Sequence, residues 1–241
     1  MIINFVGNFQ TGYVGEQADQ VHLAREMEAL GHTVRRIPQD EWREHVLDGK
    51  EYPGVPSDMK SDANIITKWH HFQTGEFAQA LRVAGGGSPV FYWVWDYMWD
   101  NGEFPDWHKG MAREASLYLT NEYGIRDIYR SYGIQRIYYF PFDVCDGALS
   151  TYQEKEKKYD VLFTGSFLTQ GNRIPWLTQI NKEIPVTIFS WNWKEWESRG
   201  FTAYPAVYGE TYNELIAQSK IILGLSVNPR CWGYWSNRVG K

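Results

Sequence analysis

Apolar and polar residues alternate in blocks along the first 140 residues of the chain. Short apolar runs rich in β-branched and aromatic residues predict strands, and several segments between them repeat apolar residues every three or four positions, as one helix face does. Strands are expected at residues 3–8, 33–37, 64–69, 89–96, 116–121 and 136–142, and helices at 16–32, 75–84 and 124–133. Alternating strands and helices are typical of a doubly wound parallel sheet, so this region predicts one α/β domain.

A polar stretch separates this block from a second one. Residues 146–158, "DGALSTYQEKEKK", have no hydrophobic period and the composition of an interdomain linker. Beyond them, strands are expected at 159–166, 185–190 and 220–226, and helices at 172–183 and 211–220. The pattern predicts two Rossmann-like domains, at 1–147 and 159–241, with a linker at 148–158.

The second block holds three expected strands and is followed by the beginning of a helix. Ser236 can act as N-cap of a turn that contains Arg238, but no apolar stripe follows before Lys241. A three-stranded parallel sheet without its last crossover helix would expose apolar surface. We therefore expect the second domain to be incomplete, as in a truncated chain.

Composition narrows the class of protein. The chain has 241 residues and 43% hydrophobic content, which indicates a globular protein. Its 12 Trp, 16 Tyr and 12 Phe exceed what packing usually requires, so some rings are candidates for stacking on sugars or bases. A net charge of −5 argues against a mainly electrostatic interface with nucleic acid, although a local basic cleft stays open.

Cysteine usage and apolar runs bear on the cell compartment. Cys145 and Cys231 are far apart in sequence, so neither a disulfide framework nor a structural zinc site is indicated. The start of the chain lacks the basic region of a signal peptide, and no run of about 18 apolar residues exists. We expect a cytoplasmic protein without a membrane span.

Three segments at expected strand ends in the first domain carry candidate chemistry. Gly12 and Gly15 lie in a loop before a helix, where backbone N–H groups favour an anion, or they only tighten the turn. His70 or His71 could act as a general base, and Asp96 could accept a proton from a hydroxyl or only cap a turn. No D-x-D pair is present, so a metal-bridged pyrophosphate has no evident ligands and no metal site is expected.

The second domain offers a possible phosphate site. Gly165 and Ser166 form a turn after a strand, and Arg173 begins the next helix, so backbone amides and a guanidinium could bind a diphosphate. The alternative for Arg173 is a solvated surface charge. The segment "FSWNWKEW" at 189–196 could wall a base-binding slot or close the core.

The order of these motifs resembles the GT-B-fold glycosyltransferases, in particular group 1. The resemblance rests on "TGYVGEQADQVHLAREMEALGHTV", "ASLYLTNEYGIRDIYRSYGIQRIYYFPFDVCD", "DVLFTGSF" with "NRIPWLTQI", and "VYGETYNELIAQSKIILGLSVNP" with "GYWSNRV". It implies an acceptor domain, a nucleotide-sugar-binding domain and transfer of a sugar to an acceptor hydroxyl, with no cofactor beyond the donor substrate.

The resemblance also implies roles for single residues. Asp96 would lie near the reacting centre. His70 and His71 are catalytic candidates from their position at a strand end rather than from the resemblance. The residues implied in donor binding are Gly12, Gly15, Gly165, Ser166, Arg173, Ser236 and Arg238. Two other functions stay open, a non-catalytic two-lobed sugar- or nucleotide-binding protein and a glycosyltransferase that modifies DNA.

Overall fold

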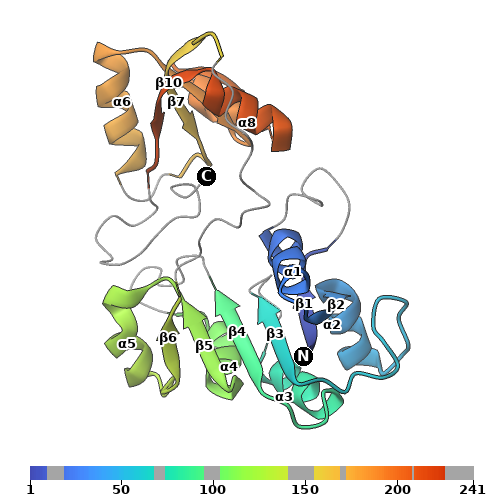
Figure 1. Cartoon of the computed structure of the whole chain (residues 1–241). Helices are drawn as coiled ribbons and strands as arrows, with labels where there is room; N and C mark the ends of the chain where they lie inside the picture. The colour runs from blue at the N-terminus through green and yellow to red at the C-terminus, as the bar shows by residue number, and fades with distance from the viewer. Residues whose placement is uncertain are drawn as a thin grey trace. The chain divides into compact units, whose positions relative to one another are not determined.

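The computed structural model describes residues 1–9, 19–67, 74–94, 104–140, 155–168, 172–207 and 209–225. These residues form two compact units, the first up to residue 140 and the second from 155 to 225. Each unit is built around its own parallel sheet, whose strands are drawn as arrows in Figure 1. The two α/β sheets expected from the sequence are therefore confirmed.

The first unit holds a six-stranded sheet with helices in the connections between strands. Its strands are β1 (Ile2–Gly7), β2 (Thr33–Pro38), β3 (Ala63–Thr67), β4 (Val90–Val94), β5 (Leu117–Thr120) and β6 (Ile137–Tyr139). Its helices are α1 (Asp19–Ala29), α2 (Gln39–Asp48), α3 (Gly75–Ala84), α4 (Asp106–Glu114), the 3₁₀ turn η1 (Tyr123–Ile125) and α5 (Arg126–Ser131). All strand pairs are parallel, in the order β2-β1-β3-β4-β5-β6. The order reverses between β1 and β3, which makes that pair the switch point of the sheet.

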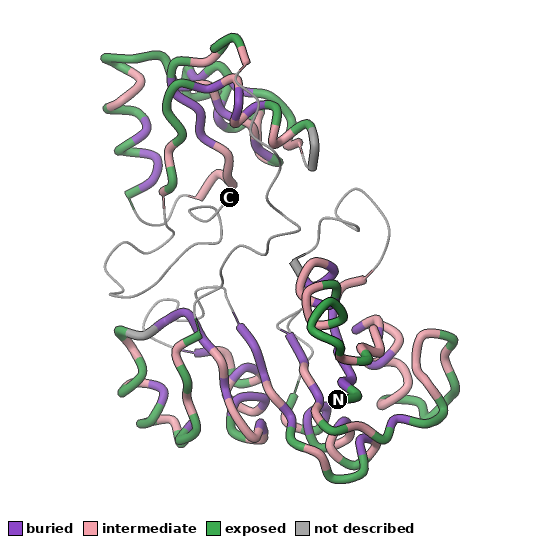
Figure 2. Tube along the Cα trace, viewed as in Figure 1, coloured by how far each residue is buried: buried purple, intermediate pink, exposed green. Residues whose placement is uncertain are grey.

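The core of this unit lies on the sheet and under its helices. Central strands of a parallel sheet are covered on both faces, so they need continuous apolar runs. In β4, Val90, Tyr92, Trp93 and Val94 are all buried, and Figure 2 shows this strand in the buried colour over most of its length. Helix α3 adds a buried face, of which Leu81 is fully inaccessible.

The second unit is a four-stranded parallel sheet with a separate core. Its strands are β7 (Tyr159–Thr164), β8 (Val186–Ser190), β9 (Thr202–Pro205) and β10 (Ser219–Leu223), and its helices are α6 (Arg173–Glu183), α7 (Trp193–Glu197) and α8 (Gly209–Ala217). The order is β10-β7-β8-β9, so the switch point lies between β7 and β10. Leu177, Ile188 and Trp196 are fully buried at the centre of this core.

Several elements differ from the sequence-based prediction. The second sheet has four strands rather than three, because β9 forms in a segment that the pattern did not assign. Helices α2, α4 and α7 were also not predicted. In β9 only Ala203 is buried, and in α7 only Trp196, so neither segment repeats its apolar residues with a recognisable period.

The described end of the expected linker lies against α8. The Lys157 side chain donates to the carbonyl of Ala217 at 2.8 Å, and the Lys158 N–H donates to the carbonyl of Gln218 at the same distance. Residues 155–158 thus contact the second unit. The domain boundaries predicted from the sequence stay predictions, because residues 141–154 and 226–241 lie outside the described part of the chain.

Candidate functional site

The carboxyl edge of the second sheet gathers three loops around its switch point. In open α/β sheets, ligands bind outside the carboxyl ends of the strands where the strand order reverses. The loop that begins at Gly165 follows β7, residues 191–192 follow β8, and residues 224–225 follow β10. Because β10, β7 and β8 are neighbours in the sheet, these loops emerge side by side.

Arg173 joins two of these loops. It begins α6, and only 4% of its surface is exposed. Its Nη1 donates to the carbonyl of Ser166 and its Nη2 to the carbonyl of Leu225, both at 3.0 Å. The guanidinium carbon also lies 5.4 Å from the centre of the Phe163 ring. Arg173 is therefore a buried bridge across the switch point, and the alternative of a solvated surface charge is wrong.

Gly165 lies where no side chain fits. A Cβ atom at this position would be 2.7 Å from the ring of Phe163, closer than real Cβ contacts come. The N–H of Gly165 donates to the carbonyl of Phe189 in β8 at 3.2 Å. The glycine therefore lets the loop cross the Phe163 ring, while its amide is used inside the sheet. Ser166, the next residue, is half-buried in the same turn.

The tryptophans after β8 divide between core and surface. Trp196 is fully buried, with ring contacts to Phe163, Phe167 and Phe201, and Trp193 packs against the same core. Trp191, the first residue after β8, is 55% exposed. Two of the three rings thus close the core, and only Trp191 is placed to contact a ligand.

Asn192 links this segment to the loop after β7. Its Oδ1 accepts a hydrogen bond from the backbone N–H of Phe167 at 3.2 Å, and its own N–H donates to the Ser190 hydroxyl at 3.1 Å. Together with Arg173, this bond ties the loops after β7, β8 and β10 into one unit. A site whose walls are fixed in this way loses little conformational entropy when a ligand binds.

Three of the residues predicted from the sequence lie together. Arg173 lies beside the Gly165–Ser166 turn, because its guanidinium donates to the carbonyl of Ser166. The remaining candidates, Gly12, Gly15, His70, His71, Asp96, Ser236 and Arg238, lie outside the described residues. Their roles stay predictions.

A chain of buried polar groups runs through the first unit and was not predicted. The Tyr92 hydroxyl lies 3.1 Å from His108 Nδ1, and the Tyr118 hydroxyl lies 3.2 Å from His108 Nε2. Tyr118 in turn donates to the Tyr129 hydroxyl at 2.9 Å, and Tyr129 donates to the Glu122 carboxylate. Since the Tyr118 proton points to Tyr129, His108 Nε2 donates to the Tyr118 hydroxyl oxygen. In a neutral imidazole, Nδ1 then accepts from Tyr92.

This buried chain changes the acidity of its tyrosines. Both Tyr118 and Tyr129 have a pKa well above the usual value, mainly because burial disfavours the phenolate form and also because Glu122 is close. Both hydroxyls therefore stay protonated at neutral pH and serve as hydrogen-bond donors. All five side chains are completely inaccessible, so the chain fixes the packing of β4, α4, β5 and α5 rather than contacting a ligand.

Two further observations concern metals and membranes. Within the described ranges, no group of three or more His, Cys, Asp or Glu residues is arranged to hold a metal ion. None of the helices in that part of the chain is long and apolar enough to cross a bilayer.

Comparison with known proteins reveals similarity at the level of structure. No protein-family model matches the chain, and no curated protein matches it in sequence. One similar solved structure is an α-glucosyltransferase in complex with UDP and a 13-mer DNA containing an HMU base, with a TM-score of 0.60 and 9% identity over 92% of this chain and 71% of that one.

Two more structures of α-glucosyltransferase are similar to the same extent. One is in complex with UDP, with a TM-score of 0.59 and 8% identity, and covers 92% of this chain and 72% of that one. The other is in complex with UDP-glucose and DNA containing an abasic site, with a TM-score of 0.57 and 10% identity, and covers 92% and 71%. At this identity the likeness concerns the fold, and it confirms that this chain has the two-domain α/β fold, of GT-B type, of these glucosyltransferases.

Proposed function

We propose that this protein is a glycosyltransferase that moves a sugar from a nucleotide-sugar donor to the hydroxyl of an acceptor. The observation that carries the proposal is the linked set of loops at the switch point of the second sheet, in a fold shared with structures that hold UDP or UDP-glucose. UDP-glucose is therefore the first donor to test.

The donor would bind at these loops. We assign the Gly165–Ser166 turn to the diphosphate, and Arg173 holds this turn to the end of β10. Because Arg173 Nη1 and Nη2 donate to backbone carbonyls, we assign Arg173 mainly to positioning the loops. Trp191 is a candidate surface for stacking on the base, since an exposed ring at a strand end can cover the face of a nucleobase.

The reaction needs a positioned hydroxyl and a stabilised leaving group. The acceptor oxygen forms a bond to the anomeric carbon while the bond from that carbon to the diphosphate breaks, and the hydroxyl proton goes to a base. Asp96 is our first candidate for that base, with His70 and His71 as alternatives. Further donor contacts are proposed, in keeping with group 1 membership, for Gly12, Gly15, Ser236 and Arg238. A cytoplasmic location is proposed from the composition.

The proposal is tested by donor turnover and donor binding. Purified protein should release UDP from UDP-glucose, slowly to water and faster when an acceptor is present. Trp191→Ala should raise the Kd for UDP about tenfold, because stacking on an aromatic ring contributes roughly 1 to 3 kcal/mol per base. Trp176→Ala is the matched control, since Trp176 is also exposed but lies on α6.

Two results would contradict the proposal. Absence of nucleoside diphosphate release from UDP-, GDP- and TDP-sugars would argue against an enzyme. If nucleotide binding persists without turnover and Asp96→Ala leaves binding unchanged, the protein is instead a two-lobed binding protein.

A DNA acceptor is the second candidate, and one observation favours it. Two of the similar structures hold DNA together with UDP or UDP-glucose. The net charge of the whole chain, which argued against a mainly electrostatic interface with nucleic acid, is thus a weak criterion, because charge on one face can differ from the total. Transfer of labelled glucose to DNA that carries hydroxymethylated bases, compared with unmodified DNA, tests this candidate.

A further inference from the structure

A pocket of about 350 Å³ opens at the β6 border of the first unit. Its walls come from the end of β5, from α5 and from β6. The lining residues are Thr120, Arg126, Arg130, Ile137, Tyr138 and Tyr139. Since β5 and β6 are parallel neighbours and α5 connects them, residues near the strand ends and on one helix face meet here.

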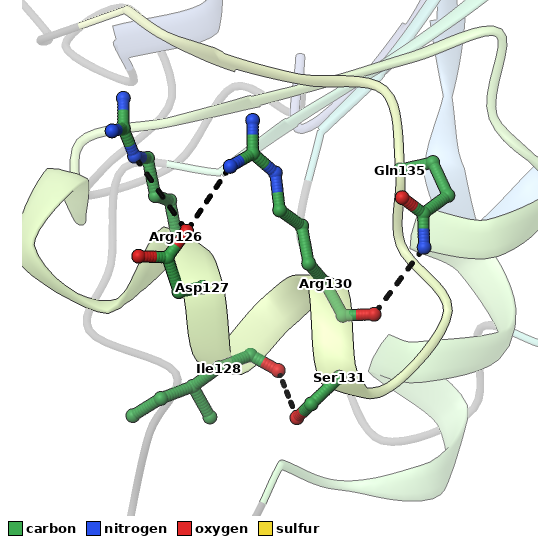
Figure 3. Close-up of polar contacts among 6 residues, drawn as sticks. All are labelled: Arg126, Asp127, Ile128, Arg130, Ser131 and Gln135. Carbon is green, nitrogen blue, oxygen red and sulfur yellow. Dashed lines mark hydrogen bonds and ion pairs between the residues drawn. The ribbon is translucent and has the colours of Figure 1, made fainter.

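Two guanidinium groups line this pocket from one face of α5. Arg126 and Arg130 are four residues apart, a spacing that places side chains on the same side of a helix. Figure 3 shows both side chains extending from α5 in the same direction, with the Asp127 carboxylate beside them. Both arginine side chains are about half-exposed. Their guanidinium groups therefore keep contact with water, unlike those of a buried ion pair.

Asp127 contacts both guanidiniums. Its Oδ1 lies 3.1 Å from Arg130 Nη1 and 3.9 Å from Arg126 Nε. The Asp127 side chain is 80% exposed. Exposed ion pairs are worth about 1 kcal/mol or less, so an incoming anion can displace Asp127 at low cost.

Exposed aromatic rings continue the surface beyond the arginines. Tyr138 lines the pocket and is 58% exposed, and Phe140 next to it is 43% exposed. Their ring centres are 6.5 Å apart, and Phe140 is held by an edge-to-face contact with Trp93 at 5.1 Å. Guanidiniums beside exposed aromatic rings form a combination that suits nucleic acid, in which phosphates and flat bases alternate.

We propose that the Arg126–Arg130 pocket binds a backbone phosphate of a DNA acceptor, with Tyr138 in contact with an adjoining base or sugar. The choice of an acceptor rests on the proposed glycosyltransferase function, because the pocket belongs to the first unit and the donor loops to the second. The free energy of such a contact comes from paired, charge-assisted hydrogen bonds and from release of counterions.

Binding of labelled DNA, measured by fluorescence anisotropy without donor, tests the proposal. The double variant Arg126→Ala/Arg130→Ala should raise the Kd for single-stranded or duplex DNA by tenfold or more, and the slope of log Kd against log salt should fall by about one for each arginine. Arg25→Ala, which removes one guanidinium at an exposed position of α1, should stay within about twofold. Asp127→Asn should bind DNA several-fold more tightly, because the competing carboxylate is gone.

Three outcomes would overturn the proposal. The first is that the double variant binds DNA as tightly as the Arg25→Ala control. The second is that Asp127→Asn weakens DNA binding. The third is that inorganic phosphate, at the concentration of DNA phosphate, displaces the labelled DNA. Circular dichroism confirms folding, and Arg130→Lys, which keeps the charge but loses the paired geometry, should lie between wild type and the double variant. Wild-type protein that releases UDP from UDP-glucose but does not bind DNA refutes only this site, whereas DNA binding through the two arginines without donor turnover refutes the enzyme proposal instead.

Discussion

Replacing Arg173 with methionine removes the two hydrogen bonds that join the loops after β7 and β10. Methionine keeps an unbranched apolar stem but loses the guanidinium, and with it the contact between that group and the Phe163 ring. The carbonyls of Ser166 and Leu225 lose their guanidinium partner. The experiment therefore removes the polar bridge while an apolar side chain stays in its place.

The expected loss follows from the surroundings of the two carbonyls. An unsatisfied buried acceptor costs about 1 to 3 kcal/mol, and the lower end applies here because Ser166 and Leu225 are half-buried and water can reach their loops. The two bonds together should thus contribute about 2 kcal/mol, which corresponds to roughly a 30-fold change in an opening equilibrium.

Native-state hydrogen exchange measures this effect within one unit. Peptides that cover β7 and β10 should exchange about 30-fold faster in Arg173→Met, while peptides of β4 and β5 in the first unit should be unchanged. Lys182→Met, the same loss of charge at an exposed position in the last turn of α6, should change exchange less than threefold. If the amide hydrogens of β7 and β10 exchange at the same rate in the two variants, the guanidinium bonds do not hold the switch point together.

Three further predictions concern packing and pH. Gly165→Ala should cost roughly 1 to 3 kcal/mol, measured by urea unfolding, because its methyl group would displace the Phe163 ring. The free energy of unfolding should fall as pH rises above about 10, because Tyr118 and Tyr129 ionise in the unfolded chain but stay neutral in the folded protein. The loss should reach about 1.4 kcal/mol per pH unit for each tyrosine. In Tyr129→Phe, stability should therefore depend less steeply on pH. Trp196→Ala should remove about 3 to 5 kcal/mol from the second unit and leave exchange in the first unchanged, since the two cores are separate; equal loss in both would contradict this.

Strands were easier to predict than the short helices, for a physical reason. The strands that carry the two cores are continuous apolar runs, which the sequence displays directly. Helix α4 buries His108 beside Met111 and Ala112, and a histidine is tolerated there because it hydrogen bonds to Tyr92 and Tyr118. Those partners lie 16 and 10 residues away, so no local pattern announces that this position belongs to the core.

The contact between the glycine turn and Arg173 was predictable from the sequence, but the hydrogen-bond partners of Arg173 were not. A glycine turn after a strand and an arginine at the next helix start are visible in the sequence, and they do come together. The guanidinium, however, bonds to a carbonyl 7 residues away and to another 52 residues away. The second partner depends on β10 pairing with β7, which only the sheet order reveals. For the same reason, the sequence did not reveal the pocket between α5 and β6.

Strand β10 also has a consequence for how the protein behaves in concentrated solution. It is the outer strand of the described second sheet, and Ile221 and Ile222 are both about half-exposed although successive residues point to opposite faces. Within the described sheet β10 has one strand neighbour, and an apolar strand in this position is a template for pairing with another chain. At the start of the strand, an ion pair of 2.6 Å between Lys220 and Asp160 places charge beside this border. Self-association at high protein concentration is therefore expected to begin at β10. It would remove protein from solution without changing the reaction that the protein catalyses. The arginine pocket of the first unit lies far from β10 in the sequence.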